Sequence, residues 1–276
     1  MAGKNEFELK ASDGVKLKGR IWGDPLKAKA LILLIHGLGE HIRRYDHVAA
    51  AFEARGLCLI GYDQRGFGRS GGRKGHIPSE EQFMADITQA IHFAKSKNVQ
   101  VPLFLYGHSM GAIEVLFYGL KYKPNVKGVL ATSPLLDVND IDPKKVKLMK
   151  LMVKILPGLA VKNDLALDGL SRDVEVVQAY RKDRLVHDKI SVQLGKFIYD
   201  APQYVLEHAG EWTLPLYLAH GTEDIICPIR GSDAFFEKAN GPILYKRWDG
   251  LYHETHNEPE KDTIIGAMMD WIETQI

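Results

Sequence analysis

Apolar residues along the chain form two kinds of pattern. Four short, mainly apolar stretches are typical of strands that are buried on both faces, as in parallel sheets. These stretches are residues 30–36, 57–62, 103–106 and 126–132. Helical spacing of apolar residues is found between them, over residues 45–54, 79–97 and 113–120. Since strands and helices alternate with short connections, the pattern favours an α/β fold with a mostly parallel sheet flanked by helices.

The two ends of the chain extend this pattern. Residues 5–22 alternate apolar and polar positions around Asp13-Gly14, which is typical of a β-hairpin turn. Further strands are expected at residues 214–220 and 243–248. Further helices are expected at residues 191–209, 232–239 and 259–276.

The alternation breaks in the middle of the chain. Residues 137–189 contain no convincing strand, but they include an amphipathic stretch at 144–156 and a second helical stretch at 174–181. We interpret residues 137–189 as a helical cap that is inserted into a core made of residues 1–136 and 190–276.

Composition and charge narrow the classes of function. The 276 residues are 45% hydrophobic and 26% charged with a net charge of +1, so nothing indicates nucleic acid binding. The longest apolar run, residues 30–35, is too short to span a membrane, and the charged N-terminus has no apolar leader. Cys58 and Cys227 form no disulfide or metal pattern. We therefore expect a cytoplasmic protein without a metal ion or cofactor.

A glycine pattern at residues 66–71 has the form G-x-G-x-x-G, which also occurs in dinucleotide-binding sites. Such a site needs the glycines to open a helix whose N-terminus meets the pyrophosphate. Here the loop continues through Gly75 and Pro78 before the next helical stretch begins. The pattern therefore does not indicate a nucleotide site.

The sequence Gly107-His108-Ser109-Met110-Gly111 stands between a buried strand and a helical stretch. A G-x-S-x-G element in this setting is typical of a nucleophile on a sharp strand-to-helix turn, where a Cβ on either side would collide with neighbouring backbone. Ser109 is therefore the candidate nucleophile.

A serine nucleophile needs a base and a group that orients the base. Asp224 follows the strand at 214–220, and His253 follows the strand at 243–248. The order Ser, acid, His along the chain matches serine hydrolases with a parallel sheet. Glu223 is an alternative for the acid and His256 for the base.

The oxyanion of an acyl-transfer reaction needs preorganised N–H donors. One expected donor is the backbone N–H of Met110, directly after the nucleophile. The other is the backbone N–H of Leu38, in the glycine-bearing loop after the strand at 30–36.

Motifs along nearly the whole chain resemble those of monoacylglycerol lipases, in the lysophospholipase-like branch of the α/β-hydrolases. Ala112 departs from the second glycine that this family often has after Gly111. The matching stretches are His36-Gly37-Leu38-Gly39-Glu40-His41, Arg44-Tyr45, Asp63-x-Arg65-Gly66-x-Gly68-x-Ser70, Gly107-His108-Ser109-Met110-Gly111, Ser133-Pro134-Leu135, Leu170-Ser171-Arg172, Gly221-x-x-Asp224-x-x-Cys227 and Tyr252-His253.

The resemblance implies a lipid ester substrate, a fatty-acyl tunnel under the cap and a polar pocket for the alcohol. Glu40, Arg44 and Tyr180 are candidates for polar contacts with the alcohol. Leu135 and Leu136, together with cap methionines, are candidates for the apolar lining. The resemblance also places the thiol of Cys227 near the acid, where a small buried apolar residue is the favoured explanation. Alternatives remain on the same fold: a broader carboxylesterase, a lysophospholipase, a C–C hydrolase or serine aminopeptidase, and a non-catalytic binding protein.

The cap stretch at 144–156 carries Lys147, Lys150 and Lys154 on one face and apolar residues on another. A basic amphipathic helix of this kind can lie on an anionic lipid surface. Alternatively, its apolar face roofs the acyl pocket and its lysines are only solvated. Peripheral membrane contact is therefore a hypothesis.

Overall fold

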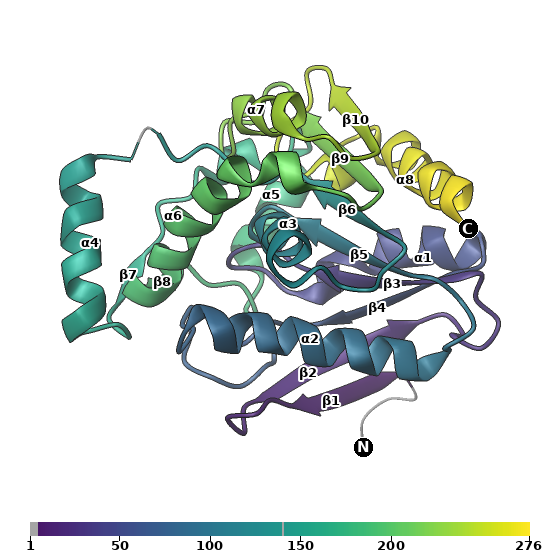
Figure 1. The fold of residues 1–276 in the computed structure, drawn as a ribbon, viewed down its shortest axis with the longest axis horizontal. Coiled ribbons are helices and arrows are strands. Elements are labelled where there is room, and N and C mark those ends of the chain that lie inside the picture. The colour runs from purple at the N-terminus through teal and green to yellow at the C-terminus, as the bar shows by residue number, and fades with distance from the viewer. Residues whose placement is uncertain (1–4, 140) are drawn as a thin grey trace.

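The computed structural model describes residues 5–139 and 141–276, and an eight-stranded sheet forms its centre (Figure 1). The strands lie in the order β1-β2-β4-β3-β5-β6-β9-β10. From β4 to β10 in this order all neighbours pair in parallel. Strand β2 pairs antiparallel with both of its neighbours, β1 and β4. The expected mostly parallel sheet is confirmed. The strands are β1 (Glu6–Lys10), β2 (Lys16–Trp22), β3 (Ala30–Ile35), β4 (Leu57–Tyr62), β5 (Leu103–His108), β6 (Gly128–Thr132), β9 (Leu216–Gly221) and β10 (Ile243–Trp248).

The helices that cover the sheet divide between its two faces, as Figure 1 shows. One core cluster contains Phe83 of α2, Leu116 of α3 and Phe197 of α6, and the other contains Phe52 of α1 and Met268 of α8. These helices are α1 (Asp46–Ala54), α2 (Glu80–Lys97), α3 (Met110–Tyr122), α6 (Val192–Glu207), α7 (Arg230–Lys238) and α8 (Lys261–Gln275), and the short 3-10 helices of the core are η1 (Ile42–Tyr45), η3 (Ala209–Glu211) and η4 (Thr255–Asn257).

Strand β3 explains why the central strands have unbroken apolar sequences. Leu31 and Leu33 pack in the cluster with α2, α3 and α6, whereas Ile32 and Leu34 pack in the cluster with α1 and α8. Successive side chains of a strand point to opposite faces, so a sheet with helices on both faces needs apolar residues at every position. The same burial on both faces extends to β4 and β5.

The hairpin expected at the start of the chain is also confirmed, and a side chain caps the first long helix. Strands β1 and β2 form the expected hairpin, in which Gly14 has a φ of +87° and the Asp13 carboxylate accepts a hydrogen bond from the N–H of Val15. Ser79 caps α2 by accepting a hydrogen bond from the N–H of Gln82. Turn and cap residues therefore fix where these elements begin.

The segment between β6 and α6 differs in one respect from the expectation. It contains a small antiparallel sheet made by β7 and β8, where the sequence predicted no strand over 137–189. Strands of three residues are too short for an alternating pattern to be recognised. The elements of this segment are α4 (Pro143–Ile155), β7 (Ala160–Lys162), η2 (Leu167–Gly169), α5 (Val174–Lys182) and β8 (Lys189–Ser191). We retain residues 137–189 as the proposed limits of the cap.

Helix α4 stands at the outer edge of the molecule beside α6 (Figure 1). Its contact with α6 includes Met149, whose sulfur atom lies near Gly195, while most of its other side chains are exposed. Among the described residues, no helix is both long enough and apolar enough to cross a membrane.

Candidate active site

Ser109 lies on the sharp turn between β5 and α3, with φ 55° and ψ −114°. Only glycine fits two residues before Ser109 and two residues after it. A Cβ on Gly107 would lie 2.2 Å from the carbonyl oxygen of Gly111, and a Cβ on Gly111 would lie 2.1 Å from that of Ile35. The local sequence thus forces the backbone to present the Ser109 hydroxyl at the carboxyl edge of the sheet.

His253 contacts both Ser109 and Asp224. Its Nε2 lies 2.9 Å from Ser109 Oγ, and its Nδ1 lies 2.7 Å from Asp224 Oδ2. The structure therefore brings together the three residues that the sequence singled out. In this arrangement the imidazole can take the proton of the hydroxyl while the carboxylate holds the ring in the required tautomer.

The carboxylate of Asp224 is held in place by several donors. Its Oδ1 accepts hydrogen bonds from the N–H groups of Ile226, at 2.9 Å, and Cys227, at 2.8 Å. Burial alone would oppose ionisation, but the charge of His253 and hydrogen bonds from His220 and His253 hold the pKa of Asp224 well below its usual range. In return, Asp224 raises the pKa of His253, although burial acts against this.

The alternative residues for the base and the acid are not in contact with the nucleophile. His256 is fully buried and stacks on Tyr45 at 4.8 Å between ring centroids, and its two ring nitrogens have no hydrogen-bond partner among the described residues. Burial and neighbouring positive charges hold its pKa well below the usual value, so its ring is neutral. Glu223 is exposed on the loop beside Asp224. The geometry favours His253 and Asp224.

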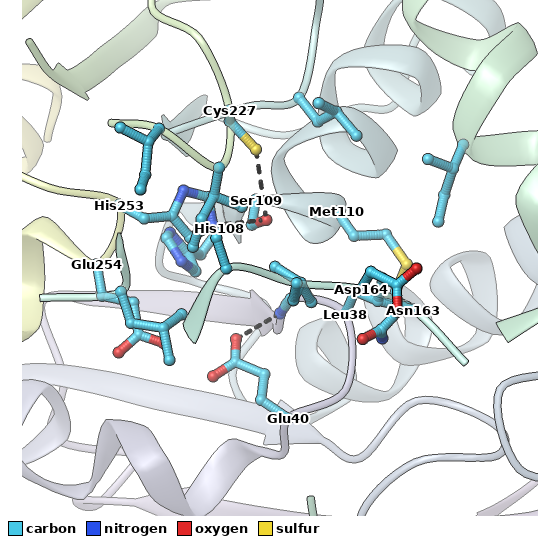
Figure 2. A pocket seen from close by; sticks show the side chains of 18 of the residues that line it. Leu38, Glu40, His108, Ser109, Met110, Asn163, Asp164, Cys227, His253 and Glu254 are labelled. Atoms are coloured by element: carbon cyan, nitrogen blue, oxygen red, sulfur yellow. Dashed lines mark hydrogen bonds between the residues drawn. The ribbon is translucent and has the colours of Figure 1, made fainter. Parts of the chain in front are cut away.

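The two expected oxyanion donors, Leu38 and Met110, both line the cavity in front of Ser109 (Figure 2). Within residues 5–139 and 141–276, neither backbone N–H is found to donate a hydrogen bond to the protein. The loop of Leu38 also lies close to the nucleophile, because a Cβ on Gly37 would be 3.3 Å from the Cβ of Ser109. Two unused donors beside a serine are what an oxyanion site requires.

A buried ion-pair network holds the Leu38 loop in position. Glu40 Oε1 accepts hydrogen bonds from the N–H of Gly37, at 2.6 Å, and from the hydroxyl of Tyr45, at 2.7 Å. Glu40 Oε2 accepts one from Arg44 at 2.7 Å. Burial opposes ionisation of Glu40, but Arg44, together with His108, His36 and the Tyr45 hydroxyl, lowers the pKa to about 2. Arg44 also binds Glu254, the residue after His253, so the network connects two loops of the site.

A cavity of 530 Å³ opens in front of Ser109 (Figure 2). Its size is in the range of sites that bind small molecules. Most of its lining is apolar, and its polar groups are concentrated near Ser109 and on the cap. Its apolar lining residues are Leu38, Met110, Leu135, Ile141, Leu165, Ala166, Leu170, Ile198, Ile225, Ile226 and Cys227. No group of three or more acidic, His or Cys side chains suited to a metal ion is found among the described residues.

The candidates for substrate contacts divide into two groups. Glu40, Tyr180 and Leu135 line the cavity, as expected. Arg44 does not line it, because its guanidinium is occupied by Glu40 and Glu254 and packs over the ring of Tyr180 at 4.7 Å. Leu136 does not line it either, because its side chain is buried in the main core cluster. For these two residues the sequence prediction is corrected.

The expectation for the cap methionines also changes. No residue of α4 lines the cavity, since this helix packs against α6 on the outside of the molecule. Other cap residues, among them Leu165 and Leu170, lie over Ser109 instead. The thiol of Cys227 is buried 4.0 Å from the Ser109 hydroxyl, and burial raises its pKa.

Sequence reasoning missed several polar residues at the site, among them Asp164, which lines the cavity from the cap. His220 lies 3.1 Å from Asp224 and supports it, Glu254 pairs with Arg44, and Asn163 lines the cavity from the cap. His220 ends the strand before Asp224, and Glu254 follows the proposed base, so both positions carried a weak signal. Asn163 had none, because it lies in an irregular segment.

Comparisons of the sequence and the fold with known proteins also point to serine hydrolases. The family model Hydrolase_4, described as serine aminopeptidase, S33, matches residues 26–260. A monoacylglycerol lipase of Mycolicibacterium smegmatis is 32% identical over 98% of this chain and 97% of the relative. The crystal structure of Paleococcus ferrophilus monoacylglycerol lipase superposes with a TM-score of 0.87 and 31% identity, covering 94% of this chain and 99% of that one.

One relative is much longer than this chain. An uncharacterized abhydrolase domain-containing protein of Dictyostelium discoideum is 36% identical over 97% of this chain. The match covers only 29% of that protein, so this chain corresponds to a minor part of its length.

Proposed function

The chain belongs to the Hydrolase_4 family, the serine aminopeptidase S33 family, and on this premise we propose that it hydrolyses monoacylglycerols to fatty acid and glycerol through an acyl-enzyme on Ser109. The chain is a serine hydrolase of carboxylic esters, the class to which its named relatives belong. The observation that carries the proposal is the contact of His253 with both Ser109 and Asp224, in front of a largely apolar cavity.

The first half of the reaction forms the acyl-enzyme. His253 Nε2 takes the proton of Ser109 while Oγ attacks the ester carbonyl carbon, and the carbonyl oxygen becomes an oxyanion that accepts hydrogen bonds from the N–H groups of Leu38 and Met110. The ester C–O bond then breaks, and the protonated His253 gives its proton to the departing glycerol oxygen. Asp224 stabilises the imidazolium throughout.

The second half releases the fatty acid. A water molecule takes the place of the alcohol and gives its proton to His253 as it attacks the acyl carbon. The bond to Ser109 breaks, the hydroxyl regains its proton from His253, and the fatty acid leaves. All proton transfers use the chain's own residues.

The outer face of the cap provides a surface for the lipid that contains the substrate. Leu148, Leu151 and Ile155 of α4 are 59%, 55% and 64% exposed, although their side chains are large and apolar. Lys147 and Lys154 are exposed on the same helix. Apolar side chains flanked by lysines suit the surface of an anionic bilayer, where the apolar groups enter the headgroup region and the lysines meet phosphates. The cap therefore docks on lipid with α4 facing the membrane.

A substrate panel tests the proposed function. The rates of hydrolysis of monoacylglycerol, diacylglycerol, triacylglycerol and lysophospholipid with the same acyl chain are compared, with Ser109→Ala as the blank. We expect the highest kcat/KM for the monoacylglycerol. A higher value for the lysophospholipid would assign the alternative function, and no turnover of any ester would contradict both.

A further inference from the structure

Asn163 presents an unpaired polar group at the wall of the catalytic cavity. It follows β7 in the cap and lines the same cavity as Ser109 and His253 (Figure 2). Its main chain is fixed, because its N–H donates to the carbonyl oxygen of Asp188 at 2.6 Å. Its side-chain nitrogen is buried and has no hydrogen-bond partner among the described residues. Folded proteins rarely leave a buried donor unpaired, so a ligand at this wall of the cavity is a candidate partner for the amide.

A second polar group lies close to the Asn163 amide. A Cβ placed on Gly39 would lie 3.9 Å from Asn163 Nδ2 and 3.0 Å from the hydroxyl oxygen of Tyr180. Gly39 directly follows Leu38, the proposed oxyanion donor. Two polar groups of the cap therefore lie close to the loop that would hold the reacting carbonyl oxygen.

This wall is also the polar end of the cavity. Asn163 and Tyr180 line a neighbouring cavity of 450 Å³ as well, where charged side chains such as Lys162, Arg181 and Asp183 surround them. The rest of the catalytic cavity is mostly apolar and suits an acyl chain. An alcohol with free hydroxyl groups is therefore best accommodated at the wall formed by Asn163 and Tyr180.

Glu40 also lines the cavity, as do Asp164 and Glu254, but Glu40 has its carboxylate oxygens already in use. Its carboxylate accepts hydrogen bonds from Gly37, Tyr45 and Arg44. The side-chain nitrogen of Asn163 has no such partner in the described part of the chain. Of these two side chains, Asn163 is the one with a donor left for a ligand.

We infer that Asn163 donates a hydrogen bond to a free hydroxyl of the glycerol moiety and thereby selects glycerol esters over simple alkyl esters. The inference rests on the proposed function and names the residue that supplies its selectivity. A glycerol ester pairs the buried donor, whereas an ethyl ester of the same acid leaves it unpaired. The preference therefore depends on Asn163 and not on the acyl chain.

The test compares two substrates in four proteins. The ratio of kcat/KM for a monoacylglycerol to kcat/KM for the ethyl ester of the same short-chain acid is measured below the concentration at which either aggregates. Asn163→Ala removes the amide, and Asn163→Asp keeps its shape but replaces the donor with an acceptor. Lys189→Ala, an exposed change on the neighbouring strand β8, is the control for the cap.

We expect the ratio to fall about 10-fold in both Asn163 variants, which is the effect of losing one hydrogen bond in a buried site, and to be unchanged in the control. An unchanged ratio in variants that still prefer the glycerol ester would overturn the inference and leave the proposed function intact. Equal loss on both substrates would also overturn it, since it would indicate a structural role. A wild-type enzyme with no preference for the glycerol ester would contradict the proposed substrate, and the inference with it.

Discussion

Arg44 binds both carboxylate oxygens of Glu254, with Nη1 2.5 Å from Oε1 and Nη2 2.7 Å from Oε2. Glu254 directly follows the proposed base, and Arg44 also holds Glu40 below the Leu38 loop. One buried guanidinium therefore connects the loop with the base to the loop with an oxyanion donor. Charged groups in such a position stabilise the site only as a complete set.

Loss of Arg44 should affect the whole site rather than the choice of alcohol. Arg44→Ala leaves Glu40 and Glu254 as buried carboxylates without their cation, which costs about 3–5 kcal/mol when one partner of such a network is removed. We expect a lower Tm and a similar loss of kcat on glycerol esters and ethyl esters. Thermal unfolding and both rates check this. A change confined to the glycerol ester would mean that Arg44 binds the alcohol after all.

Asp224 should set the pH dependence of activity. It raises the pKa of His253, and the base works only when it is neutral. Activity should therefore be lost as the pH falls through a value above about 6.5, the ordinary pKa of histidine. Asp224→Asn removes the charge, so kcat should fall by about 10⁴-fold and the remaining activity should persist to lower pH. Profiles of kcat/KM against pH measure both effects, and an unmoved acid limb would contradict the role of Asp224.

Docking of the cap on lipid should depend on salt and on α4. Replacing Lys147, Lys150 and Lys154 with Gln should weaken binding to anionic vesicles, and wild-type binding should weaken as salt screens charges beyond about 10 Å at 0.1 M. Activity on monoacylglycerol in vesicles should fall, while activity on a soluble ester should not. Co-sedimentation with vesicles and the two rates measure this.

The exposed apolar side chains of α4 provide the matched control. Leu148→Ser with Leu151→Ser should weaken vesicle binding even at high salt, because the apolar contribution is not screened. If neither set of variants changed vesicle binding, the cap would not be the docking surface.

Substrate preference should fall from monoacylglycerol to diacylglycerol to triacylglycerol. Each further acyl chain would have to enter the polar end of the cavity at Asn163 and Tyr180, where buried polar groups left unpaired cost about 1–3 kcal/mol each. Initial rates in mixed micelles of constant composition give the order. Equal hydrolysis of triacylglycerol would contradict this view of the cavity without affecting the roles of Ser109, His253 and Asp224.

Features that are fixed by residues close together in the sequence could be predicted from it. The turn at Ser109 could be predicted because Gly107 and Gly111 are required by backbone contacts within a few residues. The strands could be predicted because burial on both faces leaves a continuous apolar run. The hairpin and the cap of α2 depend on neighbouring residues in the same way.

Features that depend on distant contacts could not be read from the sequence. Arg44 and Leu136 were expected in the pocket, but partners far along the chain, such as Glu254, decide where they lie. The short strands β7 and β8 pair only because the cap folds back on itself. Asn163 is significant because its side-chain nitrogen lacks a partner within residues 5–139 and 141–276, which only a folded structure can reveal.

The most direct test of the account is the hydrolysis of a monoacylglycerol by the wild-type enzyme and by Ser109→Ala, with Tm measured on both. The account predicts that the wild type releases fatty acid and glycerol in equal amounts, and that the variant keeps its Tm while kcat falls by about 10³-fold or more. A folded Ser109→Ala variant that still hydrolyses the ester at a rate near that of the wild type would contradict it.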